Sequence, residues 1–372
     1  MRASPTNHIF RLLLLIFSLM LVLTLTASAQ DASSQIKAEM ERVQESLKDK
    51  PIANPDLAEI GNMISATLSD GGNALAAGRV YLSLEKLAQA TDLLEGARTA
   101  VDKAEALKAG MPAFEQEWNK ASLELSALDK QSRQRDWSHK QAGIRALSET
   151  AQGKAIPLLE GSQGFATANG PQAGLFYMGQ AQGEAAFAAF AFSLNLPRDQ
   201  QPISLRSLLP ELERLQAKTN AAFQPPRSIE LHPRFIALNS TLKLAGELDA
   251  AQAYAGTLYE YLEATRHYGM LDAVAPDTAK QARLKEAIAA AQKQIATSKR
   301  DDSIARVFLE RAESQSTPHA DGSPPLADEW RSAQVIVEQV LPAYYAALKP
   351  AAPVQRAKGI TTTVTLVRWP YT

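Results

Sequence analysis

One glutamate, Glu184, stands in a long stretch of the chain that is otherwise free of charge. It is the only charged residue among the 37 from Gly161 to Pro197. A carboxylate in such surroundings must be paired, hydrogen-bonded or protonated, because an isolated charge in a dry core is very costly. Glu184 is therefore the candidate general acid or base of the chain. The alternative is a structural carboxylate that an arginine or Tyr177 holds in place.

Two further polar residues share a helical flank with Glu184. Tyr177, Gln180 and Glu184 are spaced i, i+3 and i+7, so they fall on one side of a helix predicted over residues 173–194. The rest of that helix is apolar nearly all round, which is typical of the central helix of a bundle. Tyr177 and Gln180 are thus candidate ligand-binding residues.

Two glycines in the same helix favour close packing. Gly179 and Gly183 are four residues apart and lie on one face of it. Neither has a side chain to hold a neighbouring helix away, so we expect another helix to approach there.

A row of tyrosines marks a second predicted helix, over residues 250–268. Tyr254, Tyr261 and Tyr268 recur every seven residues along one flank. Tyrosines in such a row can line a groove and stack on a sugar or a peptide, which makes them candidate ligand-binding residues. The alternative places their rings half-buried in the core with the hydroxyl groups in water.

The opposite face of that helix carries the spacing closest to a metal site. Glu260, Glu263 and His267 could present ligands together. However, the di-iron bundle pattern needs Glu-x-x-His, whereas this chain has Glu-x-x-x-His without a second copy. A solvated polar face explains the same residues, and we expect neither a metal nor another cofactor.

Searches for nucleophilic and phosphate-binding motifs find nothing. The chain has no Gly-x-Ser-x-Gly, no Gly-x-x-x-x-Gly-Lys and no His-Glu-x-x-His sequence. Because it has no cysteine, it can form neither a disulfide nor a thiol nucleophile. A paired-carboxylate site stays open, since its two residues come from distant segments.

The elements that must position these residues are helices. Apolar residues recur at helical spacing, as in Ile36, Met40, Val43 and Leu47, and strand-like alternation is nearly absent. Clusters of Gly and Pro separate the helices, at residues 161–171, 196–202, 225–233, 269–276, 314–325 and 350–353. The prediction is an all-α fold, either a multi-helix bundle or an irregular α-solenoid of antiparallel helices.

The start of the chain is typical of a secretory signal peptide. Arg2 and Arg11 precede an uncharged run that ends in Ala27, Ser28 and Ala29. We expect cleavage after Ala29, no membrane span thereafter, and a periplasmic or secreted protein. The alternative is an uncleaved anchor, although the apolar run is short for a membrane span.

The remaining chain divides into three predicted regions. These are an N-terminal helical region over residues 30–160, a C-terminal helical region over 161–349 with the apolar central helix, and an extended tail over 350–372. From residue 30 onward there are 37 basic against 40 acidic residues, which leaves a net charge of −3. That balance gives no reason to expect nucleic acid as a partner.

The tail carries the one long β-like pattern. β-Branched residues alternate from Ile360 to Trp369, with a weaker match at Ser228–Leu231. A lone strand must pair its backbone groups, either within the chain at Ser228–Leu231 or on another molecule. The segment Ile360–Trp369 is therefore the candidate contact with another envelope protein, unless it pairs within the chain or is a disordered tail.

Two functions are consistent with these features. The leading one is a non-catalytic helical scaffold or binding module of the cell envelope. The alternative is an envelope hydrolase or lyase that acts on a polymer, with Glu184 as acid or base and the tyrosine row as the substrate platform. A Glu184 at the floor of an open cleft that faces the tyrosine row would favour the enzyme, and a Glu184 sealed against an arginine would not.

Overall fold

The computed structural model describes residues 31–50, 52, 57–104 and 106–349. Within these ranges the regular secondary structure is helical, with two isolated β-bridges and no strand. The prediction of an all-α, multi-helix fold is confirmed. The β-like segment Ile360–Trp369 and the predicted signal peptide lie outside the described residues. No helix of the described ranges has the length and apolarity needed to cross a membrane.

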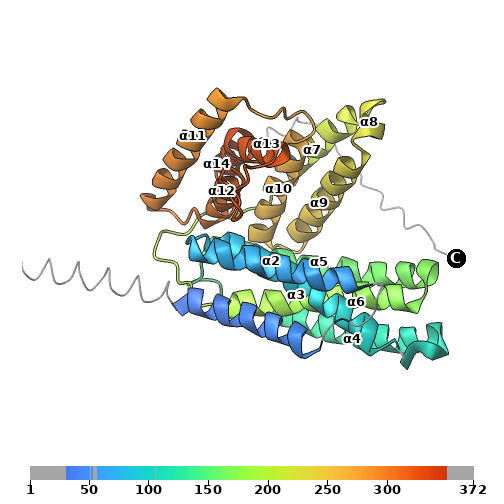
Figure 1. Ribbon diagram of the computed structural model, residues 1–372. Coiled ribbons are helices and arrows are strands. Elements are labelled where there is room, and N and C mark those ends of the chain that lie inside the picture. Colours follow the sequence, from blue (N-terminus) through green and yellow to red (C-terminus); the bar gives the residue numbers. More distant parts are fainter. Residues whose placement is uncertain (1–30, 51, 53–56, 105, 350–372) are drawn as a thin grey trace, which may run out of the picture.

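The first group of helices forms a bundle of elements that run alongside one another (Figure 1). It contains a helix over residues 31–49, α2 (Ala58–Ala76), α3 (Val80–Asp102), the 3-10 turn η2 (Ala106–Ala109), α4 (Met111–Ser132), α5 (Ala142–Asn169) and α6 (Pro171–Ser193). Helix α6 packs against α3, α4 and α5. The apolar helix therefore lies at the centre of this bundle, as predicted.

The second group lies over the first, and its main helices cross the bundle steeply (Figure 1). It contains α7 (Leu209–Ala222), α8 (Arg227–Glu230), α9 (His232–Ala250), α10 (Tyr254–Gly269), α11 (Thr278–Ala296), α12 (Ser303–Gln315), α13 (Ala327–Val335), the π-helical segment η3 (Ile336–Val340) and α14 (Leu341–Ala347). Helix α5 contacts α9, α10 and α12, so it joins the two groups.

The glycines of α6 bring α3 close to it. A Cβ atom added at Gly183 would lie 2.9 Å from the Cα atom of Asp92, and one added at Gly179 would lie 2.6 Å from Oγ1 of Thr99. Only a residue without a side chain leaves room for that approach. The expected close contact is thus present, and α3 is the helix that makes it.

One predicted boundary and one predicted strand pattern are corrected. Helix α5 continues to Asn169, through the Gly161–Pro171 cluster and past the boundary placed between residues 160 and 161. Gly161 and Gly164 face open space, and the packing of α5 on α6 outweighs their weak helix propensity. The weak strand pattern at Ser228–Leu231 is also wrong, because α8 forms there.

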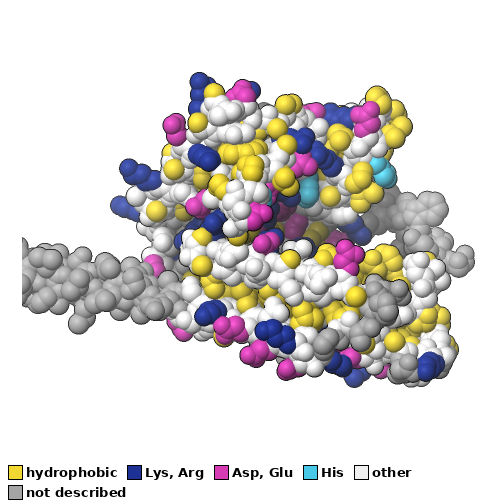
Figure 2. All heavy atoms as spheres, in the orientation of Figure 1, with side chains coloured by type: hydrophobic (Ala, Val, Ile, Leu, Met, Phe, Trp, Pro, Cys, Tyr) yellow, Lys and Arg dark blue, Asp and Glu magenta, His cyan; other side chains and the backbone are white. Residues whose placement is uncertain are grey.

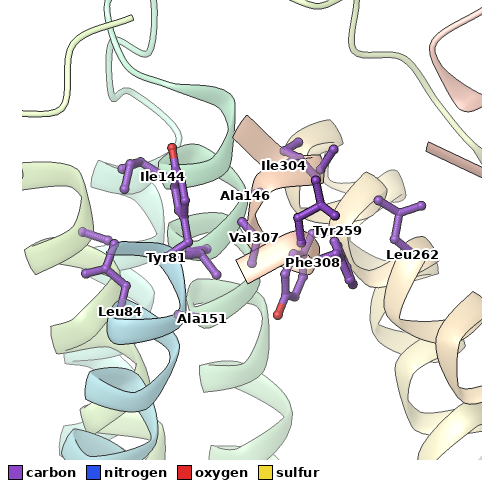
Figure 3. Packing of buried hydrophobic residues seen from close by; sticks show 14 of the residues in the cluster. Tyr81, Leu84, Ile144, Ala146, Ala151, Tyr259, Leu262, Ile304, Val307 and Phe308 are labelled. Carbon is purple, nitrogen blue, oxygen red and sulfur yellow. The ribbon is translucent and has the colours of Figure 1, made fainter. Parts of the chain in front are cut away.

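A single hydrophobic cluster extends through both groups (Figure 3). Tyr81 and Leu84 enter it from α3, Ile144 from α5, Tyr259 from α10 and Phe308 from α12. Burial of such side chains is the main favourable term in folding. The two groups are therefore parts of one core.

Carboxylates near the start of α12 and within it cap two helices of the bundle. The N-cap residue of α3 makes no capping bond of its own, and the Glu310 carboxylate instead accepts the backbone N–H groups of Tyr81 (2.7 Å) and Leu82 (3.0 Å). In the same way Asp301 accepts the N–H of Ala142 at the start of α5 (2.7 Å). These bonds satisfy N–H groups that a helix leaves free at its first turn.

The same arrangement recurs at two other helices. Glu149 of α5 accepts the N–H of Gly256 in the first turn of α10 (2.9 Å). Asp249 of α9 accepts the N–H of Leu208, which precedes α7 (2.8 Å). A negative charge near a helix N-terminus is also favoured by the helix dipole.

We expect Gly183→Ala to destabilise the protein by about 1–3 kcal/mol, because the added methyl group overlaps the backbone of α3. The matched control is Gly161→Ala, where the new methyl group meets open space and better helix propensity should raise stability by up to about 1 kcal/mol. Urea unfolding of both variants measures the difference. A neutral Gly183→Ala would contradict the close approach.

We expect Asp301→Ala to cost about 2 kcal/mol or more, because it leaves the buried N–H of Ala142 without an acceptor. Asp277→Ala, which removes the exposed N-cap of α11, should cost about 1 kcal/mol. Thermal unfolding of the two variants measures both losses of stability. A larger loss in Asp277→Ala than in Asp301→Ala would argue against a special role of the long-range cap.

Candidate functional site

A cleft opens between the two groups of helices. It consists of two adjoining cavities, of about 1140 Å³ and about 770 Å³, which share lining residues from α3, α5, α6, α10 and α12. The shared residues are Asp92, Lys154, Glu184, Tyr259, Arg311 and Gln315. Figure 2 shows acidic and basic side chains gathered in the hollow between the groups. Glu184 therefore lies in a cleft, among charged neighbours.

The α3 and α6 side of the cleft carries two carboxyl groups. Gln180 donates to Oδ2 of Asp92 (3.0 Å), whereas the buried Oδ1 has no hydrogen-bond partner among the described residues. Burial raises the pKa of Asp92 to about 8, and the negative charge of Glu184 adds to the effect. Burial also raises the pKa of Glu184, against the opposing influence of Lys154. Both groups therefore hold protons more tightly than an ordinary carboxyl group.

Lys154 of α5 is the cation beside these acids. Burial tends to lower the pKa of its ammonium group, but Glu184, Glu260 and two further carboxylates outweigh burial and raise it. Lys154 therefore carries its charge at neutral pH. Over the described ranges no carboxylate forms a direct ion pair with it, although these acids surround it. These acids nevertheless balance its positive charge.

Arg311 of α12 is bound from both sides of the cleft, by Glu85 of α3 and Glu263 of α10. It donates from Nη2 to Glu85 (2.5 Å) and to the hydroxyl group of Tyr259 (3.1 Å), and from Nη1 to Glu263. Arg266 donates to the other oxygen of Glu263 (2.8 Å). Although burial raises the pKa of Glu263, the two arginines outweigh burial and hold it well below its usual range. These charges satisfy one another and form a rigid wall.

The three predicted metal ligands, Glu260, Glu263 and His267, lie at this wall. Glu260 is buried, and burial raises its pKa to about 7. His267 is neutral at pH 7, because burial and the charge of Arg266 lower its pKa to about 4. The oxygens of Glu263 are occupied by arginines. In the described part of the chain, no three His, Asp or Glu side chains are arranged to hold a metal ion.

The cleft has too few positive charges for its acids. Nine acidic side chains line the two cavities against six Lys and Arg side chains, and Glu85, Asp92, Glu184, Glu260 and Glu263 are among the acids. With all of these groups ionised the lining would carry three uncompensated negative charges. Like charges in a desolvated site disfavour ionisation. Burial is the main cause of the raised pKa values of Asp92, Glu184 and Glu260, and neighbouring carboxylates raise those of Asp92 and Glu260 further.

The same cleft gathers polar atoms that lack partners. Arg79 Nε, Asp92 Oδ1, Thr150 Oγ1 and Gln315 Oε1 all line it, are buried, and have no hydrogen-bond partner among the described residues. The Thr150 side chain is 3% exposed. A buried polar atom without a partner is costly. Such atoms in a cavity mark the places where a polar ligand or water would bind.

The other predicted ligand-binding residues lie elsewhere. The Tyr177 ring stacks on Phe165 of α5, with ring centroids 3.7 Å apart. Tyr254, Tyr261 and Tyr268 are half-buried on α10 and do not line the cleft. Tyr261 and Tyr268 pack against the hydrophobic cluster of α7, α9 and α10. The ligand-binding roles of these tyrosines stay predictions, and Gln180 reaches the cleft through Asp92.

Sequence reasoning missed Asp92, Lys154 and Arg311. The sequence does contain a signal for Lys154. It lies on the same helix face as the apolar residues Leu147, Ala151 and Leu158. A charged residue on an apolar helix face is a candidate site residue. Arg311 has no comparable signal, because its partners are distant in the sequence.

No protein-family model, no curated protein and no solved structure matches the chain. The function must therefore be argued from the geometry and the charges of the cleft.

We expect Asp92→Asn to remove a pH dependence of stability. The pKa of Asp92 is about 8 in the folded protein and about 4 in the unfolded chain, so its contribution is full below about pH 4 and is lost as the pH rises through 8. From about pH 6 to about pH 9 the wild type should lose about 2–3 kcal/mol more than Asp92→Asn.

The measurement is urea unfolding at both pH values. The control Asp70→Asn removes a carboxyl group from an exposed position of the same cleft and should retain the wild-type pH dependence. Equal pH dependence of the wild type and Asp92→Asn would contradict the raised pKa.

Proposed function

We propose that the protein is an exported, non-catalytic binding protein of the cell envelope whose cleft holds a small organic cation with one or more alkylammonium groups. The observation that carries this proposal is the excess of acidic over basic side chains in a cleft where Asp92 Oδ1 is buried without a partner among the described residues. A bound ammonium group would supply the missing positive charge and donate three hydrogen bonds.

The position of the acids supports a cation at the α3 and α6 side. Asp92 and Glu184 lie there together, while Glu85 and Glu263 are already paired with Arg311. Thr150 adds an unpartnered hydroxyl oxygen. An ammonium group between Asp92 and Glu184 would form charge-assisted hydrogen bonds, which are roughly twice as strong as neutral ones.

Binding of this kind is coupled to protons. Without a ligand, Asp92 holds its proton at neutral pH because its pKa is about 8. A bound cation stabilises the ionised carboxylate and expels the proton. The affinity should therefore increase as the pH rises towards 8.

The size of the cleft suits a small molecule. Its cavities, of about 1140 Å³ and about 770 Å³, are comparable with the upper range of ligand sites in proteins. Export rests on the sequence pattern of Arg2, Arg11 and the Ala27–Ala29 end, which favours a periplasmic or secreted location.

The alternative is a hydrolase or lyase with Glu184 as the acid or base. The raised pKa values of Glu184 and Asp92 favour it, because a general acid must hold its proton near the working pH. The tyrosine row that was to bind the polymer does not line the cleft. Binding of a small cation uses the acids of the cleft without that row.

We expect diaminobutane to bind the protein saturably, and butanediol, which has the same chain length without charge, not to bind. Isothermal titration at neutral pH in buffers of different ionisation enthalpy should show proton release with the diamine. Asp92→Asn and Glu184→Gln should each weaken binding by about ten-fold or more, whereas Asp70→Asn should change it by less than about two-fold.

Equal binding of the diol, or unchanged affinity in Asp92→Asn, would contradict the proposal. If the wild type converted the diamine or a supplied polymer into a product and Glu184→Gln did not, the result would favour the enzyme instead.

A further inference from the structure

A second cavity lies where α4, α5 and the turn between α9 and α10 meet. It has a volume of about 790 Å³, and we call it the Gln152 pocket. The charged residues that α3, α6 and α12 contribute to the cleft do not line this pocket. The Gln152 pocket adjoins the cleft at Pro157 and Glu247, which line both, but its other lining residues give it a different chemistry.

Gln152 is the residue that marks this pocket. Its side chain is 6% exposed and lines the cavity, yet neither Oε1 nor Nε2 has a hydrogen-bond partner among the described residues. A buried amide offers one acceptor and two donors, and leaving all of them unpaired is costly. The amide edge is matched by a group that offers both a donor and an acceptor, such as a peptide group.

Arg135 supplies the charge of the pocket. It donates from Nη1 to Oγ of Ser148 and to the carbonyl oxygen of Ala188, both at 3.1 Å, and its guanidinium group lies 5.0 Å from the centre of the Phe192 ring. These partners are neutral. Within the described ranges no carboxylate pairs with Arg135, and burial lowers its pKa.

The other charges of the pocket are balanced or exposed. Arg133 pairs with Asp129 (2.9 Å) and Arg145 with Glu149 (2.6 Å). Glu160 and Glu247 are exposed acids that also line the cavity, and Glu247 pairs with Lys243 (3.7 Å). Arg135 is thus the cation that an anionic ligand would meet inside the pocket.

The spacing of the two groups defines the ligand. Ser148, which holds the Arg135 guanidinium, and Gln152 are four residues apart on α5, so their Cβ atoms lie on one face of the helix, roughly 5–6 Å apart. We propose that the Gln152 pocket binds a molecule that carries a carboxylate beside an amide, as the C-terminal end of a short peptide does. The carboxylate pairs with Arg135, and the last peptide group pairs with the Gln152 amide.

The test uses N-acetylated dialanine and its C-terminal amide, which differ only in the carboxylate. We expect the acid to bind full-length protein in an isothermal titration, and the amide to bind at least about ten-fold more weakly. Gln152→Met, which keeps the side-chain size but removes both polar atoms, should abolish binding. It should also raise Tm by about 2 °C, because an unpaired buried amide is lost.

Two further variants complete the test. Arg135→Gln should abolish binding, while Arg133→Gln, which removes an exposed arginine paired with Asp129, should keep it. No saturation up to about 10 mM acid, equal binding of the acid and the amide, or binding that survives in Gln152→Met would each overturn the proposal. A lowered Tm in Gln152→Met would show a structural amide instead.

Discussion

Carboxylates on one helix hold the first turn of another, and the rest of the structure depends on these contacts. Glu310 joins α12 to α3, Asp301 joins the start of α12 to α5, and Glu149 joins α5 to α10. These four helices carry most of the cleft's charged side chains. The caps therefore do more than satisfy free N–H groups, because they fix the distance between the two walls of the cleft.

The carboxyl groups of the cleft are held close together, so their negative charges repel one another. Gly183 brings the backbone of α6 against Asp92, so the acids on α3 and α6 cannot move apart without breaking the packing of both helices. Without a ligand the repulsion is relieved by protons on Asp92 and Glu260. A site that is rigid before binding loses little conformational entropy when a ligand arrives.

The sequence predicts this fold where the signal is local. The apolar surroundings of Glu184 and the pair Gly179 and Gly183 are sufficient to place α6 at the centre, and helical spacing alone brings Glu260 and His267 to one face. The cleft could be predicted only in part, because its charge depends on residues from five helices. The caps could not be predicted, since helix N-termini are expected beside Ser, Thr, Asp or Asn, whereas α3 and α5 follow Arg79 and Gln141.

The long-range caps also bear on how the chain reaches this structure. Tyr81 and Glu310 are separated by 229 positions, and Ala142 and Asp301 by 159. Helical proteins usually fold rapidly because their contacts are local, and folding slows as the mean sequence separation of contacts grows. During synthesis the first turns of α3 and α5 stay uncapped until the last quarter of the chain has emerged. The helices of the bundle can pack on one another earlier, but the first turns of α3 and α5 are completed only when the second group of helices docks.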